Sequence, residues 1–301
     1  MRSEHVPLVA EERDFDLPTT PPRQTVSFGT APIRMKNILV TGATSGIGLA
    51  IAKSLVEHGH EVWGTSRNLE RIPKMPRLHP IRLDLANGLS IEEAFASTLA
   101  EAGHLDVLIN NAGAGHFGPA ERLPLETITG QFQILVFGQI QLMELALHHM
   151  QARGEGLIIN VTSLASRLPV PFMAAYNAAK AAMASFTMSL QLELGDSDVH
   201  VVDLQPGDIR TEFNQGVVRS GKSDPRYDAK VDKAWEVIEH TMKNAPSPDI
   251  VARQALNLIN TDKPPPRVTV GDVFESKIAP LIFRFLPQRV RVWGLKRHYG
   301  I

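Results

Sequence analysis

The sequence predicts an α/β protein built on a doubly wound parallel sheet of about seven strands in a single domain. Two observations support this fold class. Short apolar runs alternate with longer helical patterns between residues 35 and 271, which is typical of a parallel sheet covered by helices on both faces. The first apolar run leads directly into a glycine-rich turn and a helix, which is how dinucleotide-binding folds begin.

The composition is that of an ordinary globular protein and excludes several function classes. The 301 residues are 43% hydrophobic and 21% charged, and a net charge of −1 provides no field for nucleic acid. The absence of cysteine excludes disulfides and thiolate chemistry. No apolar run approaches the roughly 20 residues of a membrane span, and no carboxylate–histidine cluster has the spacing of metal ligands. We expect a cytoplasmic protein with no catalytic metal and no nucleic-acid partner, and we do not expect membrane contact.

Residues 1–34 are predicted to be a flexible tail, because they are polar and repeatedly interrupted by proline. Residues 35–301 would then form the folded domain, starting with a strand at Asn37–Thr41. The turn Gly42–Gly48 has the spacing GxxxGxG and leads into a helix that ends near His58. Glycines let a backbone approach a pyrophosphate, and a helix N-terminus offers free N–H groups to it. A tight turn with a purely structural role is the alternative.

The end of the second strand, Glu61–Thr65, indicates which dinucleotide is bound. An acidic residue there would accept hydrogen bonds from a free ribose 2′-hydroxyl and favour NAD(H). This chain instead has Ser66 and Arg67 after Thr65. A guanidinium with hydroxyl neighbours suits a 2′-phosphate, so NADP(H) is favoured over NAD(H). The alternative is that Arg67 is a solvated loop cation.

Further strands are expected to place polar residues at the same edge of the sheet. The third, His79–Leu83, ends at Asp84, and a helix at Ser90–Ala102 follows with Ser90 and Glu93 spaced as a capping box. The fourth strand, Val107–Asn110, runs into the turn Asn110–Gly113. A long helix is predicted at Leu125–Gln151. The later strands are predicted at Gly156–Val161, Val199–Gln205 and, less clearly, Arg267–Val270.

Ser163, Tyr176 and Lys180 are the candidate catalytic residues. Ser163 follows a strand at its C-terminal end, where ligands bind in open α/β sheets. Tyr176 and Lys180 are four residues apart in an alanine-rich segment, so they lie on one face of a helix. A nearby lysine cation stabilises a phenolate and lowers its pKa, while Ser163 can hydrogen-bond the reacting oxygen. The set suits proton transfer at a carbonyl or alcohol oxygen, although the tyrosine–lysine spacing alone also fits a surface pair.

Five motifs occur in a fixed order along the chain and together resemble the short-chain dehydrogenase/reductase family in its single-domain form. The resemblance covers roughly residues 35–271. Weaker features, Arg67 and the loop Gly115–Pro119, look like the NADP-preferring steroid and retinol dehydrogenases. The five motifs are Thr41-Gly42-x3-Gly46-x-Gly48, Asn110-Asn111-Ala112-Gly113, Ser163, Tyr176-x3-Lys180 and Pro206-Gly207.

The resemblance implies a Rossmann-type fold and a role for each matching residue. Tyr176 would be the acid/base, Lys180 would lower its pKa and bind the nicotinamide ribose, and Ser163 would orient the substrate carbonyl. Homodimers or homotetramers are also implied by the family. The cofactor would be lined by Gly42, Thr44, Ser45, Gly46, Ile47, Gly48, Arg67, Asp84, Asn111, Gly113, Tyr176, Lys180, Pro206, Gly207, Ile209 and Thr211, with Thr211 at the carboxamide.

One position departs from the family pattern. Leu135 stands where many members have an asparagine that helps to hold a water in a proton relay behind the lysine. Because leucine cannot hydrogen-bond, a cofactor-binding protein with weak or no turnover is the alternative to an active enzyme. The complete Ser163, Tyr176 and Lys180 set favours the enzyme.

Apolar residues around the expected site predict a small hydrophobic ketone or aldehyde, or the matching alcohol, as substrate. A lid is expected at about 212–248. Residues 272–301 form a basic amphipathic extension, expected to pack on the lid or on a neighbouring subunit, with peripheral membrane contact as the less favoured option.

Overall fold

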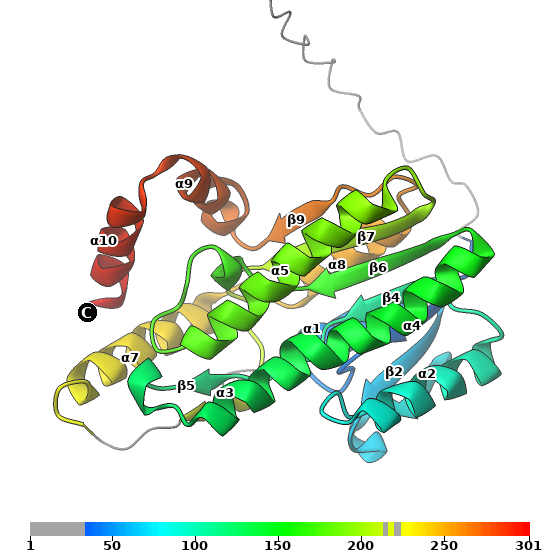
Figure 1. Cartoon of the computed structure of the whole chain (residues 1–301), viewed down its shortest axis with the longest axis horizontal. Coiled ribbons are helices and arrows are strands. Elements are labelled where there is room, and N and C mark those ends of the chain that lie inside the picture. The colour runs from blue at the N-terminus through cyan, green and yellow to red at the C-terminus, as the bar shows by residue number, and fades with distance from the viewer. Residues whose placement is uncertain (1–33, 213–215, 220–223) are drawn as a thin grey trace, which may run out of the picture. The chain divides into compact units, whose positions relative to one another are not determined.

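Seven parallel strands form the central sheet in the order β3-β2-β1-β4-β6-β7-β9 (Figure 1). The computed structural model describes residues 34–212, 216–219 and 224–301. The expected tail lies outside these residues except for Arg34, as do residues 213–215 and 220–223 of the expected lid. The strands are β1 (Asn37–Val40), β2 (Glu61–Ser66), β3 (Leu78–Arg82), β4 (Val107–Asn110), β6 (Gly156–Val161), β7 (Val199–Pro206) and β9 (Arg267–Val270).

The predicted doubly wound parallel sheet is confirmed, including its last strand. Every neighbouring pair runs parallel; for example, Ile38 pairs with Val62 on one side and with Val107 on the other. The central strands are apolar throughout because helices cover both faces of the sheet. The strand order reverses beside β1, so the carboxyl ends of β1 and β4 border the crevice in which such sheets bind ligands.

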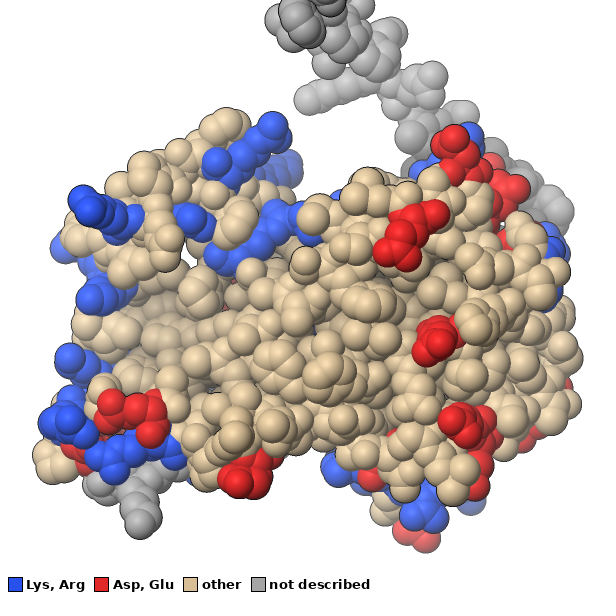
Figure 2. Space-filling model, viewed as in Figure 1, with Lys and Arg blue, Asp and Glu red and all other residues tan. Residues whose placement is uncertain are grey.

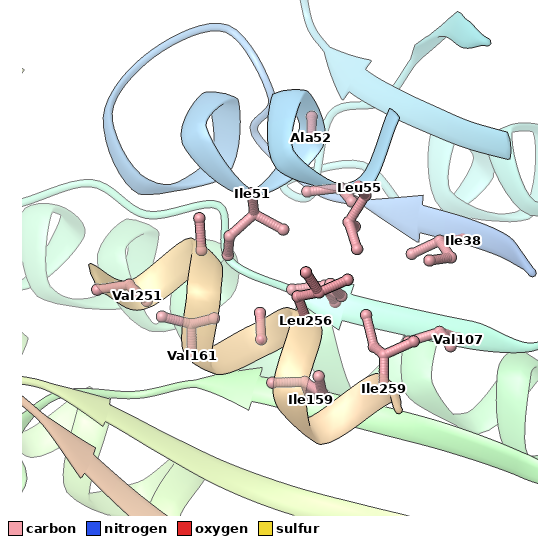
Figure 3. Close-up of a cluster of buried hydrophobic side chains, with 14 of the residues drawn as sticks. Ile38, Ile51, Ala52, Leu55, Val107, Ile159, Val161, Val251, Leu256 and Ile259 are labelled. Carbon is pink, nitrogen blue, oxygen red and sulfur yellow. The ribbon is translucent and has the colours of Figure 1, made fainter. Parts of the chain in front are cut away.

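Helices α1 (Gly46–Glu57) and α8 (Asp249–Ile259) cover one face of the sheet. Figure 3 shows Ile51 and Leu55 of α1 directed toward Leu256 of α8. Each fully buried side chain of this size contributes about 1.5–3 kcal/mol. This core fixes α1, whose N-terminus lies at the glycine-rich turn.

The opposite face is covered by α2 (Gly88–Ala102), α4 (Gly138–Arg153) and α5 (Ala174–Leu194). The capping box predicted at Ser90 is wrong. The N-cap is Asn87, whose Oδ1 accepts from the N–H groups of Leu89 and Ser90. The Ser90 hydroxyl instead accepts from the Asp84 N–H at 3.0 Å, so it holds the end of β3.

The single long helix predicted at Leu125–Gln151 is in fact three segments. These are α3 (Leu125–Phe132), a π-helical turn (Gln133–Phe137) and α4. Gly138 follows this turn and packs closely against the loop between β3 and α2. A Cβ at Gly138 would lie 2.1 Å from the Leu85 carbonyl oxygen. A π turn of this kind is often found at functional sites.

Smaller elements stand beyond the carboxyl ends of the strands, at the same end of the molecule as α10 in Figure 1. A two-stranded sheet pairs β5 (His116–Phe117) with β8 (Val218–Arg219), and the sequence analysis missed both. The helices there are α7 (Asp228–Asn244), α9 (Ala279–Phe285) and α10 (Gln288–Tyr299), with a π turn at Phe274–Ile278 before α9. Short 3-10 turns lie at Leu69–Arg71, Ala120–Arg122 and Leu164–Ser166.

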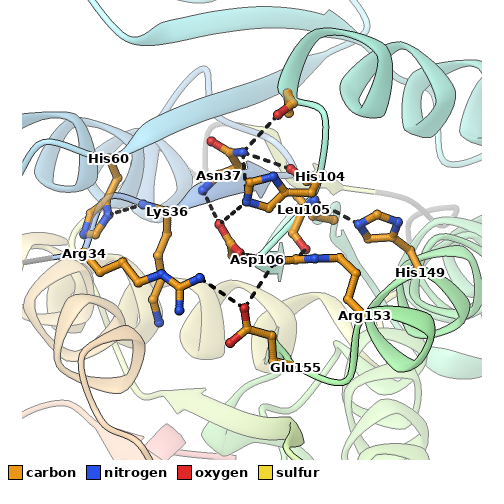
Figure 4. A network of polar contacts seen from close by, with 11 residues as sticks. Arg34, Lys36, Asn37, His60, His104, Leu105, Asp106, His149, Arg153 and Glu155 are labelled. Atoms are coloured by element: carbon orange, nitrogen blue, oxygen red, sulfur yellow. Dashed lines mark hydrogen bonds and ion pairs between the residues drawn. The ribbon is translucent and has the colours of Figure 1, made fainter.

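A polar network joins the opposite ends of the strands (Figure 4). The Asp106 carboxylate accepts from the Asn37 N–H at 2.8 Å and from the Arg153 guanidinium at 3.1 Å. The His149 side chain of α4 accepts from the Leu105 N–H at 3.1 Å. These contacts stabilise the end of the sheet that is remote from the ligand crevice.

Candidate active site

The turn between β1 and α1 requires glycine at three positions, because side chains there would be strained or would collide with neighbouring atoms. Gly42 and Gly46 have φ of +71° and +54°, in the left-handed region that favours glycine. A Cβ on Gly48 would lie 2.2 Å from the Gly42 carbonyl oxygen and 2.4 Å from Asn111 Nδ2. The N-cap Ser45 makes no side-chain hydrogen bond to the first turn of α1. A backbone cradle at an uncapped helix N-terminus fits a pyrophosphate.

Asn111 ties the turn after β4 to the turn after β1. Its Nδ2 donates to the Thr41 carbonyl oxygen at 2.9 Å, and the Thr41 hydroxyl accepts from the N–H groups of Asn111 and Ala112. The amide of this predicted cofactor residue is therefore engaged with the backbone. Gly113 follows, with a virtual Cβ 3.6 Å from Leu135 Cδ2, so Leu135 packs beneath this turn.

The ends of β2 and β3 border the same crevice. The buried Thr65 hydroxyl accepts from the Gly42 N–H at 3.3 Å, which joins the second strand to the glycine turn. Arg67 is exposed and has no ion-pair or hydrogen-bond partner within the part of the chain that is described. The Asp84 carboxylate accepts from the Ala86 N–H at 3.0 Å and is partly exposed at the end of β3.

Ser163, Tyr176 and Lys180 are brought together at the end of β6. Ser163 is the N-cap of the 3-10 turn that follows β6, where its Oγ accepts from the Ala165 N–H at 3.1 Å. It also hydrogen-bonds the Tyr176 phenol. Lys180 is buried one helical turn further along α5, with its Nζ 5.9 Å from the Tyr176 ring centroid. Its ammonium donates to the Val161 carbonyl oxygen at 2.7 Å.

Burial controls the ionisation of both groups on α5. It raises the pKa of Tyr176 to about 12, and the hydrogen bond to Ser163 offsets only part of that shift. The sequence predicted a lowered pKa, which is wrong for this structure because desolvation of the phenolate dominates. Burial lowers the pKa of Lys180 to about 8, opposed by the charge of Asp203. At neutral pH Tyr176 is a neutral phenol and a proton donor, and Lys180 is largely a cation.

Asp203 is a buried carboxylate on β7 that the sequence analysis missed. It accepts from Gln205 Nε2 and Arg267 Nε, each at 2.7 Å, and from the Thr162 hydroxyl. A single acidic residue inside the apolar strand Val199–Pro206 was the available signal. The negative charge of Asp203 stabilises the Lys180 cation, which raises the pKa of Lys180 against the effect of burial.

The segment after β7 follows the cofactor edge of the sheet. Thr211 lies over the glycine turn, since a Cβ on Gly46 would be 3.2 Å from the Thr211 Cβ. Gly207 donates to the Val270 carbonyl oxygen, and the Asp208 N–H donates to Glu275 at 2.6 Å. Pro206 pairs with Val270, and the Ile209 side chain is buried in the core with α1 and α8. Pro206, Gly207 and Ile209 therefore shape this segment.

Two glutamines flank Leu135 on the helix that contains the π turn. Gln139 donates to the Ala112 carbonyl oxygen at 2.8 Å, and Gln131 donates to that of Ala114 at 3.1 Å. Leu135 itself is 0% exposed, and its π turn packs against α5. The turn after β4 is thus supported by glutamine amides on each side of Leu135. The sequence analysis missed both glutamines because the expected helix was continuous.

An apolar cluster lies against Tyr176 and provides a hydrophobic wall. It includes residues of the loop before α5, of β5 and of α7, and the C-terminal residues Tyr299 and Ile301 join it. Phe117 packs edge to face on Phe172 and Trp235. The sequence analysis predicted an apolar site, but the sequence gave no signal that Tyr299 and Ile301 belong to it. Within the described ranges, no group of His, Asp or Glu is arranged to hold a metal ion.

Comparisons with known proteins agree with this fold. The family model described as short chain dehydrogenase matches residues 36–221. A 3-ketodihydrosphingosine reductase of Bacteroides thetaiotaomicron is 31% identical over 267 residues, covering 88% of this chain and 98% of that protein. A short-chain dehydrogenase structure from Streptomyces avermitilis matches with a TM-score of 0.75 and 30% identity, covering 87% and 96% of the two chains.

A serine dehydrogenase solved with NADP+ matches with a TM-score of 0.68 and 28% identity, covering 79% of this chain and 96% of that one. The match to the family model and the similarity to the Bacteroides protein extend over most of the fold and include the candidate site. This chain therefore belongs to the short-chain dehydrogenase/reductase family and is an oxidoreductase of that family.

Proposed function

We propose that this protein is an NADP(H)-dependent carbonyl reductase, or an alcohol dehydrogenase in the reverse direction, that acts on a hydrophobic ketone or aldehyde. The observation that supports it most is the Tyr176 phenol, hydrogen-bonded to Ser163 with Lys180 behind it, beside an apolar cluster. The Bacteroides relative is named as a 3-ketodihydrosphingosine reductase, which supports a ketone as the substrate class.

The cofactor assignment follows from the cradle at Gly42–Gly48 and from Arg67. The Cβ-free turn at the N-terminus of α1 fits the pyrophosphate. Arg67, exposed after β2, is available for the 2′-phosphate of NADP(H), and the serine dehydrogenase relative was solved with NADP+. When bound, NADPH supplies the hydride that reaches the carbonyl carbon.

Residues of this chain then bind and protonate the substrate carbonyl oxygen. Ser163 donates a hydrogen bond to the substrate carbonyl oxygen, and Tyr176 transfers its phenolic proton to that oxygen as negative charge develops. The raised pKa of Tyr176 keeps the proton in place until that moment. The Lys180 cation stabilises the phenolate that remains, and its own charge is supported by Asp203.

Replacement of Tyr176 by Phe tests this role. The variant keeps the ring and loses the proton, so NADPH-dependent reduction of a panel of hydrophobic ketones and aldehydes should be abolished. NADPH binding, followed by fluorescence titration, should be nearly unchanged. Loss of cofactor binding together with turnover would contradict a role in proton transfer.

The second candidate function is a cofactor-binding protein with weak or no turnover. It is supported by Leu135, which is fully buried and cannot hydrogen-bond. NADPH binding with no reduction of any carbonyl in the panel would favour it.

Self-association is proposed through the faces of α4 and α5, as in other members of this family. The view in Figure 2 shows a broad area with few charges over these helices. Phe186, Met188 and Leu192 of α5 are exposed, as is Phe137, the last residue of the π turn before α4. We also propose that the reaction takes place in the cytoplasm, as the sequence analysis expects from the ordinary composition.

A further inference from the structure

The last part of the chain carries a one-sided charge. Residues 276–301 contain six Lys or Arg and no Asp or Glu. In Figure 2, blue side chains gather over α9 and α10, at the end of the molecule beyond the strands. Since the whole protein has a net charge of −1, this concentration is local. The basic residues are Lys277, Arg284, Arg289, Arg291, Lys296 and Arg297.

The same segment exposes large apolar side chains in a regular pattern. Phe274, Ile278, Leu281 and Phe285 are spaced by four, three and four residues along the π turn and α9, so they lie on one side of the helical run. All four are exposed, and Phe285 is 69% exposed. With the exposed Trp293 of α10 and the basic residues other than Arg291, whose guanidinium lies 4.6 Å from the centre of the Phe283 ring, they define what we call the C-terminal face.

Basic side chains of this face lie close to its aromatic side chains. Trp293 is 64% exposed and has Arg289 one turn before it and Lys296 and Arg297 one turn after it. The Arg284 guanidinium lies 5.4 Å from the centre of the Phe285 ring. Exposed aromatic residues next to Lys and Arg are typical of segments that lie in the headgroup region of a bilayer.

The inner side of this segment is already occupied. Tyr299 and Ile301 pack in the apolar cluster beside Tyr176, and α10 contacts α7. The sequence analysis predicted that residues 272–301 pack on the lid. That packing explains the burial of Tyr299 and Ile301, but it leaves the C-terminal face without a partner. A second copy is a poor partner for that face, because a two-fold interface would bring its five exposed cations close to the same five cations of the other copy.

We infer that the C-terminal face docks on an anionic lipid bilayer, with its aromatic and aliphatic side chains in the headgroup region and its basic residues on lipid phosphates. This is surface contact: no helix within residues 34–212, 216–219 and 224–301 is both long and apolar enough to cross a membrane. The docking surface is argued independently of the proposed function; only the reason for docking rests on that function. A bilayer is where a lipophilic carbonyl substrate dissolves, and Tyr299 and Ile301 link the docked segment to the site.

Vesicle flotation of the full-length protein, without cofactor or substrate, tests the inference. The protein should float with vesicles of phosphatidylcholine and phosphatidylglycerol, should stay behind with phosphatidylcholine alone, and should be released by high salt. Each basic residue near the surface is expected to contribute roughly a fivefold change in affinity. Replacing Arg289 and Lys296 by Glu should therefore abolish flotation.

Exposure-matched variants separate the face from general surface effects. Phe285→Ser should weaken binding, whereas Leu125→Ser on α3 should not, although both side chains are 69% exposed. Arg253→Glu combined with Lys53→Glu, on the exposed side of α8 and α1, is the control for charge. Folding of each variant is checked by circular dichroism.

Two outcomes overturn the inference. One is a folded wild-type protein that ignores anionic vesicles. The other is a set of variants of the C-terminal face that change the oligomeric state and leave flotation unchanged. Carbonyl reduction is measured separately, so flotation without turnover would contradict the proposed function and leave the docking surface intact.

Discussion

Leu135 shows how one residue can change the support of a site without removing the site. It fills the space under Gly113, and glutamine amides at Gln131 and Gln139 hold the neighbouring carbonyl groups. The proposed proton donor Tyr176 and its partners Ser163 and Lys180 are brought together without a side-chain amide at position 135. We therefore regard Leu135 as a packing solution compatible with turnover.

Leu135→Asn measures this directly. A buried polar side chain in place of packed leucine should lower the free energy of unfolding by about 2–3 kcal/mol. Turnover per folded molecule should stay within about twofold, because the substitution does not alter the proposed proton transfer from Tyr176. A large gain in turnover would instead show that the wild-type relay is impaired and would favour the weak-turnover alternative.

We propose that cofactor choice depends on Arg67. Arg67→Ala should then remove charge-assisted hydrogen bonds of about 1.5–3 kcal/mol to the 2′-phosphate. NADPH affinity should fall roughly 10- to 100-fold, while NADH affinity should change little. Titration of both dinucleotides, with the nearby exposed Arg71→Ala as control, provides the measurement. An equal loss of affinity for NADPH and NADH would mean that Arg67 does not bind the 2′-phosphate.

At the scale of elements, ion pairs anchor the loop before α7 to the segment before α3. The buried Asp224 carboxylate receives Arg122 from one segment and Arg226, at 2.7 Å, from the other. These cations hold the pKa of Asp224 well below its usual range. Arg122 follows β5 along the chain and Asp224 follows β8, so the anchor joins the two segments that continue from this strand pair.

Asp224→Asn should loosen this anchor. Trypsin should cleave at Arg219 and Arg226 several times faster, and the KM for a hydrophobic carbonyl should rise more than kcat falls. Asp232→Asn, which removes only the exposed pair with Arg219, should have little effect on either measurement. Equal protease resistance of wild type and Asp224→Asn would contradict the anchoring role.

Elements made of contiguous apolar residues could be predicted from the sequence, because a buried parallel strand must be apolar on both sides. The strands of the central sheet followed from such runs. Ser163 was placed by its position after the strand Gly156–Val161, and Tyr176 and Lys180 were placed by their spacing of four residues in a helical segment. The π turn could not be predicted, since Gln133–Phe137 has the same residue types as an α-helix. The β5–β8 pair joins two-residue strands about a hundred positions apart. Tyr299 and Ile301 reach the site only through tertiary packing.

At the scale of the whole molecule, Glu275 links the C-terminal extension to the cofactor edge of the sheet. Its carboxylate accepts from the Asp208 N–H and the Asp272 N–H. Burial raises the pKa of Glu275 to about 7, and it also raises the pKa of Asp208. The folded protein therefore retains a proton on Glu275 that the unfolded chain releases near pH 4.5.

The free energy of unfolding should thus decrease as pH rises from about 4.5 to about 7, because the unfolded state binds fewer protons there. After allowance for solvent screening, Glu275 should account for about 1–2 kcal/mol of this loss. Denaturant unfolding at pH 5 and pH 8 should show a smaller difference for Glu275→Gln than for wild type. The exposed Glu236→Gln is the control, and an unchanged difference in Glu275→Gln would refute the assignment.

The strand order also determines when the chain can fold during synthesis. β1, near the start of the domain, lies between β2 and β4 in the interior of the sheet, while β9 closes the edge beside β7. Until Arg267–Val270 leaves the ribosome, the edge of β7 is unpaired and Asp203 lacks its Arg267 partner. Most of the chain must be made before the sheet is complete. Nascent chains that stall before residue 267 are accordingly the species that most need chaperones.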